Sequence, residues 1–229
     1  MGRHTLAGNP PIDVTLRNSA RAKRLSLRVS RLDGRVTLTM PHRTPAREGI
    51  AFLQAKEPWL RGHLDQLTPL QEATPGGTVL FRGRTLPIES VQNARSSIKD
   101  DRIIVRANKP AGPQVKALMR HEARDALVAA SDRYAARLGR QYTRLTIRDT
   151  RSRWGSCTAQ GGLMYSWRLI MAPPEVLDYV AAHEVAHLVQ MNHSSAFWQV
   201  VAELCPAYQT HRHWLRDQGD RLHRISFDH

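Results

Sequence analysis

The sequence has 229 residues, 41% of them hydrophobic, and a formal net charge of +14. This length and composition allow one main core with a smaller companion and exclude a wholly disordered chain. No apolar run approaches the ~20 residues that span a bilayer, and the basic N-terminus lacks the apolar segment of a signal peptide. Two cysteines, Cys157 and Cys205, suit a reducing cytosol better than a disulfide scaffold. We therefore expect a cytoplasmic protein that makes no membrane contact.

The first predicted elements are strands. Residues 12–40 alternate apolar and polar side chains with a period of two, which predicts a sheet with one buried and one wet face. Leu32-Asp33-Gly34-Arg35 provides a hairpin signal between the last two strands. The arginines of this stretch fall on the polar positions, so we interpret them as a solvated face rather than as a binding stripe.

A helical segment follows the strands. It begins near Thr44, the expected N-cap, with Pro45 in the first helical position. Its apolar stripe runs to about residue 67, although Pro58 must kink the helix or start a second one. Trp59 is expected to anchor the core.

The next stretch, residues 68–77, is rich in Pro, Gly and Thr and predicts a linker or long turn. Further strands are predicted at 78–82, 85–91 and 102–106. Residues 1–110 should therefore form a β-rich N-terminal region with a helical insertion. Nothing in this region carries recognisable chemistry.

The C-terminal half begins with a long helix at 113–138, which Gly139 ends in a C-cap role. Strands are predicted at 142–148 and 163–169, on either side of a polar turn at 150–157. Prolines 173 and 174 start another helix, and two shorter helices and a polar tail follow it. Helices packed against a small sheet define an α+β domain, which we expect to cover residues 111–229.

The helix after the prolines carries the motif around which the domain is organised. Residues 182–193 contain H-E-x-x-H and a third histidine six positions after the second. Residues four apart on a helix lie about 40° apart around the axis, so His183 and His187 project from one face. Two imidazoles placed in this way can bind one zinc ion, and Glu184 beside them is free to handle a water proton. The spacing predicts a hydrolytic zinc site.

The third zinc ligand has two candidates. His193 is favoured, because Asn192 can end the helix in a left-handed conformation that turns the chain back toward the ion. Three protein ligands leave the open position that a catalytic zinc needs. Glu203, one helix downstream, is the alternative and would imitate sites built from two histidines and a carboxylate. The similar run at His121–Asp125 has aspartate in place of the second histidine, and we interpret it as a charged helix face.

The chemistry of such a site is hydrolysis of an amide. The zinc lowers the pKa of a bound water toward about 7, and Glu184 takes the proton. A cationic or hydrogen-bonding group should stabilise the oxyanion. The sequence leaves four candidates open for this substrate or transition-state contact: Arg153, Tyr165, Tyr208 and His211. The strand Leu163–Arg168 can hold an extended peptide by edge pairing.

The net charge favours a different class of partner. An excess of +14 attracts polyanions such as nucleic acid. The basic residues are scattered over the chain, which favours a solvated arginine-rich surface over a dedicated binding arm. The rival hypothesis is a basic nucleic-acid-binding protein in which the zinc is mainly structural.

Three segments together resemble a known family. Arg153-Trp154-Gly155-Ser156-Cys157, the motif His183–His187 and Asn192-His193-Ser194 look like the YgjP-like metal-dependent hydrolases, a zincin family related to the SprT-like peptidases. The similarity is strong over 142–216 and includes Phe197-Trp198. It implies a zincin-like catalytic domain, zinc bound by His183, His187 and His193, and Glu184 as the catalytic acid/base. Its SprT-like relatives include proteases that act on DNA-bound proteins, which makes DNA-associated proteolysis a further hypothesis.

The sequence thus predicts an α+β fold in which a zincin-like H-E-x-x-H helix packs on a small sheet after a β-rich N-terminal region. The predicted function is a zinc metallopeptidase with one Zn²⁺ per chain, a zinc-activated water and Glu184 as general acid/base. The expected partner is a protein or peptide substrate. The identity of the substrate, the oligomeric state and the role of the N-terminal region stay open.

Overall fold

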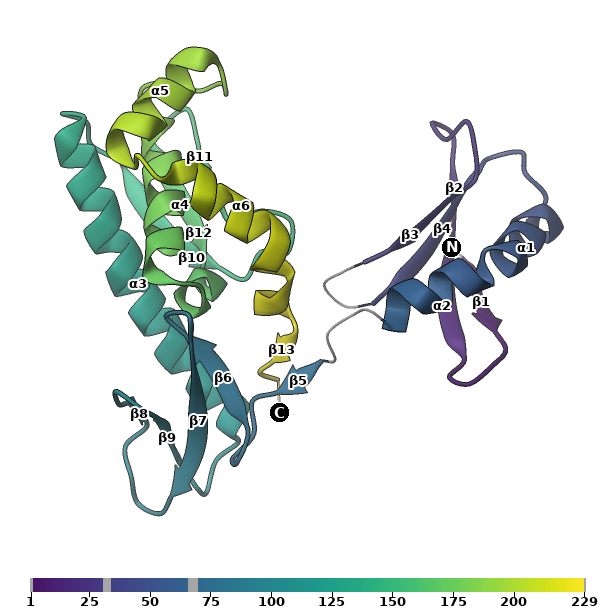
Figure 1. Ribbon diagram of the computed structural model, residues 1–229, viewed down its shortest axis with the longest axis horizontal. Coiled ribbons are helices and arrows are strands. Elements are labelled where there is room, and N and C mark those ends of the chain that lie inside the picture. The colour runs from purple at the N-terminus through teal and green to yellow at the C-terminus, as the bar shows by residue number, and fades with distance from the viewer. Residues whose placement is uncertain (1, 31–33, 66–69, 229) are drawn as a thin grey trace. The chain divides into compact units, whose positions relative to one another are not determined.

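The computed structural model describes residues 2–30, 34–65 and 70–228. The chain divides into two compact units, Met1–Pro69 and Leu70–His229, and each has its own hydrophobic core. Both units combine helices with small sheets, and the first is rich in strands (Figure 1). The predicted α+β class with a β-rich N-terminal region is therefore confirmed.

The first unit is built on a sheet with the strand order β1-β2-β4-β3, in which β2 and β4 run parallel. Its strands are β1 (Gly2–Leu6), β2 (Ile12–Ser19), β3 (Ser26–Val29) and β4 (Val36–Pro41). Alternation buries one set of side chains, such as Val14 and Leu38, and leaves the other set toward water. The strands expected within residues 12–40 are confirmed, and β1 was not foreseen. Of the predicted hairpin, Leu32 and Asp33 lie outside the described residues.

Two helices complete the first unit, α1 (Ala46–Ala55) and α2 (Glu57–Asp65). Pro45 rather than Thr44 occupies the N-cap position of α1. Pro58 is the second residue of α2, which confirms that it starts a second helix. The prediction for Trp59 was wrong: its side chain is 43% exposed and packs on His63, because the helix turns the neighbouring Leu60 into the core.

The second unit begins with strands that share a core with a long helix. The strands are β6 (Thr78–Phe81), β7 (Arg84–Val91), β8 (Ser97–Ile98) and β9 (Ile103–Arg106), in the order β6-β7-β9-β8. Ile88 and Ile103 from these strands belong to one buried cluster with Met119 and Leu127 of α3 (Ala111–Arg137). The predicted boundary at residue 110 therefore falls inside the second unit, and the compact units divide at 69/70 instead.

A three-stranded sheet follows α3, with the order β10-β12-β11. Its strands are β10 (Arg144–Arg148), β11 (Gly155–Cys157) and β12 (Gly162–Ser166). Because β12 pairs with β10 on one side and with β11 on the other, it has no free edge. The prediction that Leu163–Arg168 binds a peptide by edge pairing was therefore wrong, and the chain leaves the strand for a 3-10 helix at Trp167–Met171.

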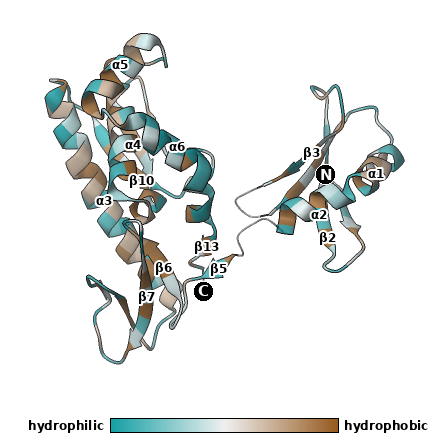
Figure 2. Cartoon of the chain, viewed as in Figure 1, coloured by the Kyte–Doolittle hydropathy of each residue, from teal (hydrophilic) through white to brown (hydrophobic). Residues whose placement is uncertain are grey.

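Three helices follow this sheet: α4 (Pro174–Ala186), α5 (Ser195–Leu204) and α6 (Tyr208–Gln218). Helix α4 contacts β11, and α5 and α6 pack against α4. Within the second unit, α4 lies between α3 and α6 (Figure 1). Pro174 begins α4 as predicted, and the hydroxyl of Ser194 caps α5 by accepting from the amide of Phe197. Figure 2 shows α6 mainly in hydrophilic colours, and none of its residues, all of them described, is buried.

The C-terminal segment is anchored rather than loose. A 3-10 helix (Gly219–His223) leads into β13 (Ile225–Ser226), which pairs with β5 (Gln71–Glu72). Leu222, Ile225 and Phe227 are buried, so the expectation of a polar tail was wrong. In the described part of the chain, no helix is both long and apolar enough to cross a membrane.

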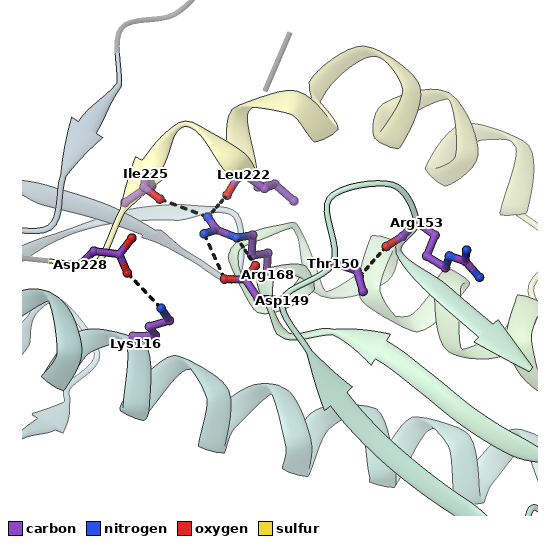
Figure 3. A network of polar contacts seen from close by, with 8 residues as sticks. All are labelled: Lys116, Asp149, Thr150, Arg153, Arg168, Leu222, Ile225 and Asp228. Carbon is purple, nitrogen blue, oxygen red and sulfur yellow. Dashed lines mark hydrogen bonds and ion pairs between the residues drawn. The ribbon is translucent and has the colours of Figure 1, made fainter. Parts of the chain in front are cut away.

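Arg168 ties this segment to the rest of the unit (Figure 3). Its guanidinium donates to Asp149 at 2.7 Å, and to the carbonyls of Leu222 at 2.9 Å and Ile225 at 3.1 Å. It also lies over the rings of Trp167 and Phe227. One side chain therefore joins the C-terminal segment to Asp149, which directly precedes the polar turn 150–157.

Candidate metal centre

The H-E-x-x-H motif occupies the C-terminal end of α4. His183 and Glu184 lie in the last turn of the helix, and His187 is its C-cap residue. The neighbours Ala182, Val185 and Ala186 are fully buried in the core. Because α4 is buried on nearly all sides, its packing fixes the direction in which the motif residues project.

Three histidines converge at this point. One ring nitrogen from each of His183, His187 and His193 can be chosen so that all three atoms lie within 4.8 Å of one another. The Nε2 atoms of His183 and His193 are 3.1 Å apart. Two zinc-bound nitrogens at about 2.0–2.1 Å from a tetrahedral ion are separated by roughly 3.3 Å, so this spacing suits a shared metal.

The chain reversal that brings His193 back differs from the prediction. After α4 the amide of Gln190 donates to the carbonyl of Ala186, which closes a turn. Asn192 is not left-handed; among the described non-glycine residues, positive φ occurs only at Arg82 and Asn93. The Asn192 side chain instead accepts from the amide of Ser194 at 3.3 Å, directly after His193. The chain therefore turns with a side-chain hydrogen bond of Asn192, and not with the left-handed backbone conformation that the sequence predicted.

Two neighbours hold the histidine rings in place. Nδ1 of His187 lies 2.9 Å from the carbonyl oxygen of Gln190, so Nδ1 carries the hydrogen and Nε2 keeps its lone pair for a metal. The buried ring of Phe197 lies within 4.9 Å, centroid to centroid, of all three histidine rings. Phe197 therefore provides the apolar surface on which the three histidine rings pack.

The protonation states also fit a metal. Burial lowers the pKa of His183 to about 3, with further lowering from the two other histidines, and burial lowers the pKa of His187 as well. Both imidazoles are therefore neutral near pH 7, which is the form that binds a metal. The buried Nδ1 of His183 has no hydrogen-bond partner among the described residues.

Glu184 is enclosed next to the cluster. Its side chain is only 6% exposed, and burial raises the pKa of its carboxyl to about 8, against a smaller opposing effect of the positive charge of Arg153. Gly155 of β11 packs directly against it, because a Cβ atom there would lie 2.5 Å from Oε1 and 2.6 Å from Cγ of Glu184. The polar turn and β11 thus form the wall behind this carboxyl.

The four residues predicted to contact substrate separate into two groups. Tyr165 is fully buried, and its hydroxyl pairs with Ser131 at 3.1 Å, so it belongs to the core and the prediction for it was wrong. Arg153 is exposed and close enough to act on the charge of Glu184. Tyr208 stacks on Trp198, which in turn stacks on His193. His211 packs on Tyr179, whose ring is 6.0 Å from His183.

The remaining candidates lie elsewhere. Glu203 is not part of the histidine cluster; it is exposed, and its carbonyl accepts from Arg137. Nε2 of His121 lies 3.5 Å from the carboxylate of Asp125 on the exposed face of α3, as expected for a charged helix face. Cys157 is held as a neutral thiol, because burial and the nearby Glu184 raise its pKa to about 11.

Sequence reasoning missed three residues of this site. Phe197 and Gly155 were noted only as parts of a motif, since their contacts with the histidines and Glu184 depend on how α5 and β11 pack. Arg212 lies over the ring of Trp198 at 4.7 Å. The sequence contained a signal for Arg212. It lies four positions after Tyr208 on α6, and residues four apart share one face of a helix.

The site combines two histidines on one helix with a third histidine and an enclosed carboxyl. This combination is typical of a metal-dependent hydrolase. The chain belongs to the YgjP-like family: the family model described as YgjP-like, metallopeptidase domain, matches residues 23–218. It is accordingly a metal-dependent peptidase. No curated protein sequence matches the chain. Among solved structures it is similar to the metallopeptidase zymogen of Pyrococcus abyssi abylysin, at 20% identity and a TM-score of 0.37, over 41% of this chain and 95% of that chain.

Proposed function

We propose that this protein is a zinc metallopeptidase in which His183, His187 and His193 bind one Zn²⁺ and Glu184 is the general acid/base. The observation that carries the proposal is the convergence of three ring nitrogens within 4.8 Å beside an enclosed carboxyl. Nitrogen ligands suit zinc, and three of them leave a fourth position for substrate or water.

The ion, when bound, supplies a Lewis acid that polarises the scissile carbonyl and makes water acidic near neutral pH. Glu184 holds the proton that the attacking water gives up at a carboxylate oxygen, and then delivers it to the leaving amide nitrogen. Its enclosure by Gly155 keeps the carboxyl at one orientation, which is what repeated proton transfer requires. The positive charge of Arg153 offsets part of the rise that burial causes in the pKa of Glu184, and so favours the ionised form that accepts the proton.

We propose β11 as the strand on which an extended peptide lies. The main chain of Trp154 and of Thr158 faces β12, through hydrogen bonds from the Ser166 amide at 2.8 Å and to the Gly162 carbonyl at 2.9 Å. Main-chain groups alternate along an antiparallel ladder, so the N–H and C=O of Gly155 and Cys157 point to the free edge. A substrate that pairs there lies beside Glu184. Arg153, Tyr208 and His211 remain the proposed substrate and oxyanion contacts.

A purely structural zinc is less consistent with these residues. Structural zinc sites take four protein ligands, whereas the histidine cluster among the described residues holds three and leaves His193 exposed. We therefore favour the catalytic role over the hypothesis of a basic protein with a structural zinc.

Metal removal tests the proposal. Dialysis against a chelator is expected to abolish cleavage of a fluorescently labelled unfolded protein, and one equivalent of zinc is expected to restore it. Far-ultraviolet circular dichroism should change little, because the core of the second unit is a large cluster of apolar side chains to which the three histidines do not belong. Full activity in protein shown by metal analysis to be zinc-free would refute the proposal.

Replacement of Gly155 by alanine tests the enclosure of Glu184. The added Cβ must displace the carboxyl, and a misplacement of about 1 Å can lower the rate on the order of 10²-fold. We expect this loss in kcat with zinc content unchanged. Gly62→Ala is the matched control, since a Cβ atom at Gly62 has open space around it. Equal activity of the two variants would contradict the assigned role of Gly155.

A further inference from the structure

The first unit carries an unusual density of positive charge. Residues 1–69 contain twelve lysines and arginines against five aspartates and glutamates, a net charge of +7. The other 160 residues of the chain supply the remaining +7, so the charge per residue is more than twice as high in the first unit. Charge of this kind attracts polyanions.

Three of these twelve basic residues, Arg3, Arg17 and Arg28, lie on one face of the sheet. Helices α1 and α2 contribute Leu53 and Leu60 to the core formed with Val36 and Leu38, so they cover the face to which those strand residues point. The side chains that alternate with them point to the opposite face. We call this the outer sheet face; it includes Arg3, Thr5, Asp13, Thr15, Arg17, Ser26, Arg28, Thr37 and Thr39.

Register aligns these residues in rows. Arg3 is paired with Thr15, Thr15 with Thr37, and Thr37 with Arg28, so one row crosses all four strands with an arginine at each edge. With strands about 4.8 Å apart, the row is about 14 Å long. A second row joins Arg17, Thr39 and Ser26.

The three arginines of the outer sheet face are exposed. Within the described part of the chain, none of Arg3, Arg17 and Arg28 forms an ion pair. Arg61 of the same unit behaves differently, since it pairs with Glu57 and donates to the carbonyls of two residues of the β1–β2 connection. Asp13 is the one carboxylate in the four described strands; it lies on the outer sheet face beside the row of Arg3 and Thr15, and it accepts from Thr5.

We propose that the outer sheet face binds the phosphate backbone of nucleic acid. Arginine side chains and the hydroxyls of threonine and serine are the groups that contact phosphates, and duplex DNA presents a phosphate about every 3.4 Å along each strand. The face carries no aromatic side chain for stacking on bases, so binding is independent of base sequence. It also lacks the apolar side chains that insert into a membrane surface. This inference does not depend on the proposed peptidase function.

The test is fluorescence anisotropy of the full-length chain with a labelled 20-base-pair duplex and the corresponding single strand, between 50 and 300 mM KCl. Wild type should bind at low salt, and log K should fall linearly with log salt concentration. In the triple variant Arg3→Gln, Arg17→Gln, Arg28→Gln, the slope on the duplex should decrease by about 2.7. Its affinity at 100 mM KCl should fall on the order of tenfold or more.

The matched control removes the same charge from the second unit. Arg120→Gln, Arg124→Gln, Arg140→Gln changes three exposed arginines that have no ion pair among the described residues, and it should retain the wild-type slope. Equal losses in the two triple variants, or no binding by wild type, would overturn the proposal. Binding only to vesicles containing phosphatidylserine would also overturn it. If circular dichroism shows that the triple variant is unfolded, Arg28→Gln replaces it, with an expected decrease in slope of about 0.9.

Discussion

Glu184→Gln is expected to lower kcat/KM for peptide cleavage by about 10²–10⁴-fold, the usual contribution of a general acid/base. Glutamine keeps the size of the side chain and fills the same space against Gly155, but it cannot accept a proton from water and return it to the leaving nitrogen. The three proposed zinc ligands are His183, His187 and His193, so the substitution at Glu184 should leave zinc bound. The measurement is kcat/KM on an internally quenched peptide, together with metal analysis of the same preparation.

Glu203→Gln is the matched control for this loss. It makes the same chemical change at an exposed glutamate outside the histidine cluster, and it should keep both activity and zinc. Cleavage by zinc-loaded Glu184→Gln at the wild-type rate would remove Glu184 from the mechanism.

Arg168→Met is expected to destabilise the second unit by about 2 kcal/mol, within the range for leaving buried hydrogen-bonding groups unsatisfied. Only 12% of the Arg168 side chain is exposed. Its loss leaves Asp149 without its partner and the carbonyls of Leu222 and Ile225 without a donor (Figure 3). Methionine keeps part of the contact with the Trp167 ring, so the loss of stability measures mainly the contribution of the polar network.

Urea unfolding followed by tryptophan fluorescence measures this effect, because four of the five tryptophans lie in the second unit. Arg148→Met is the control. Arg148 is an exposed arginine at the end of β10, and its substitution should change the free energy of unfolding by less than about 0.5 kcal/mol. A shift for Arg168→Met as small as that of the control would show that the network does not hold the C-terminal segment.

The same network predicts a dependence on pH. Burial alone would raise the pKa of Asp149, but the hydrogen bond and charge of Arg168 outweigh it and lower the pKa below 3.8. A carboxyl with a lowered folded-state pKa stabilises the protein above its unfolded-state pKa, and this contribution is lost as the pH falls through the folded-state value. The difference between wild type and Arg168→Met should therefore shrink below about pH 4.

Local patterns predicted most of the secondary structure and the centre of the site. The period of two located β2, and prolines and helical periodicity located α4. Spacing alone placed His183 and His187 together, because residues four apart on a helix share a face. These predictions succeeded where neighbours in the sequence determine neighbours in space.

The errors concern contacts between distant segments. Nothing local distinguishes β12, which is paired on both sides, from β11 at the edge, since strand order depends on which segments pair. Tyr165 looked available for substrate, but its direction is set by the sheet and by Ser131 of α3. The contact of Gly155 with Glu184 likewise joins residues far apart in the sequence. The residues that orient the chemistry were therefore found only in the folded chain.

Zinc content measured side by side in wild type, His193→Ala and Glu203→Ala tests the central claim most directly. The geometry predicts about one zinc per chain for wild type and for Glu203→Ala, and a large loss for His193→Ala, because His193 provides one of the three clustered nitrogens. Retention of zinc by His193→Ala together with its loss from Glu203→Ala would contradict the proposed metal centre.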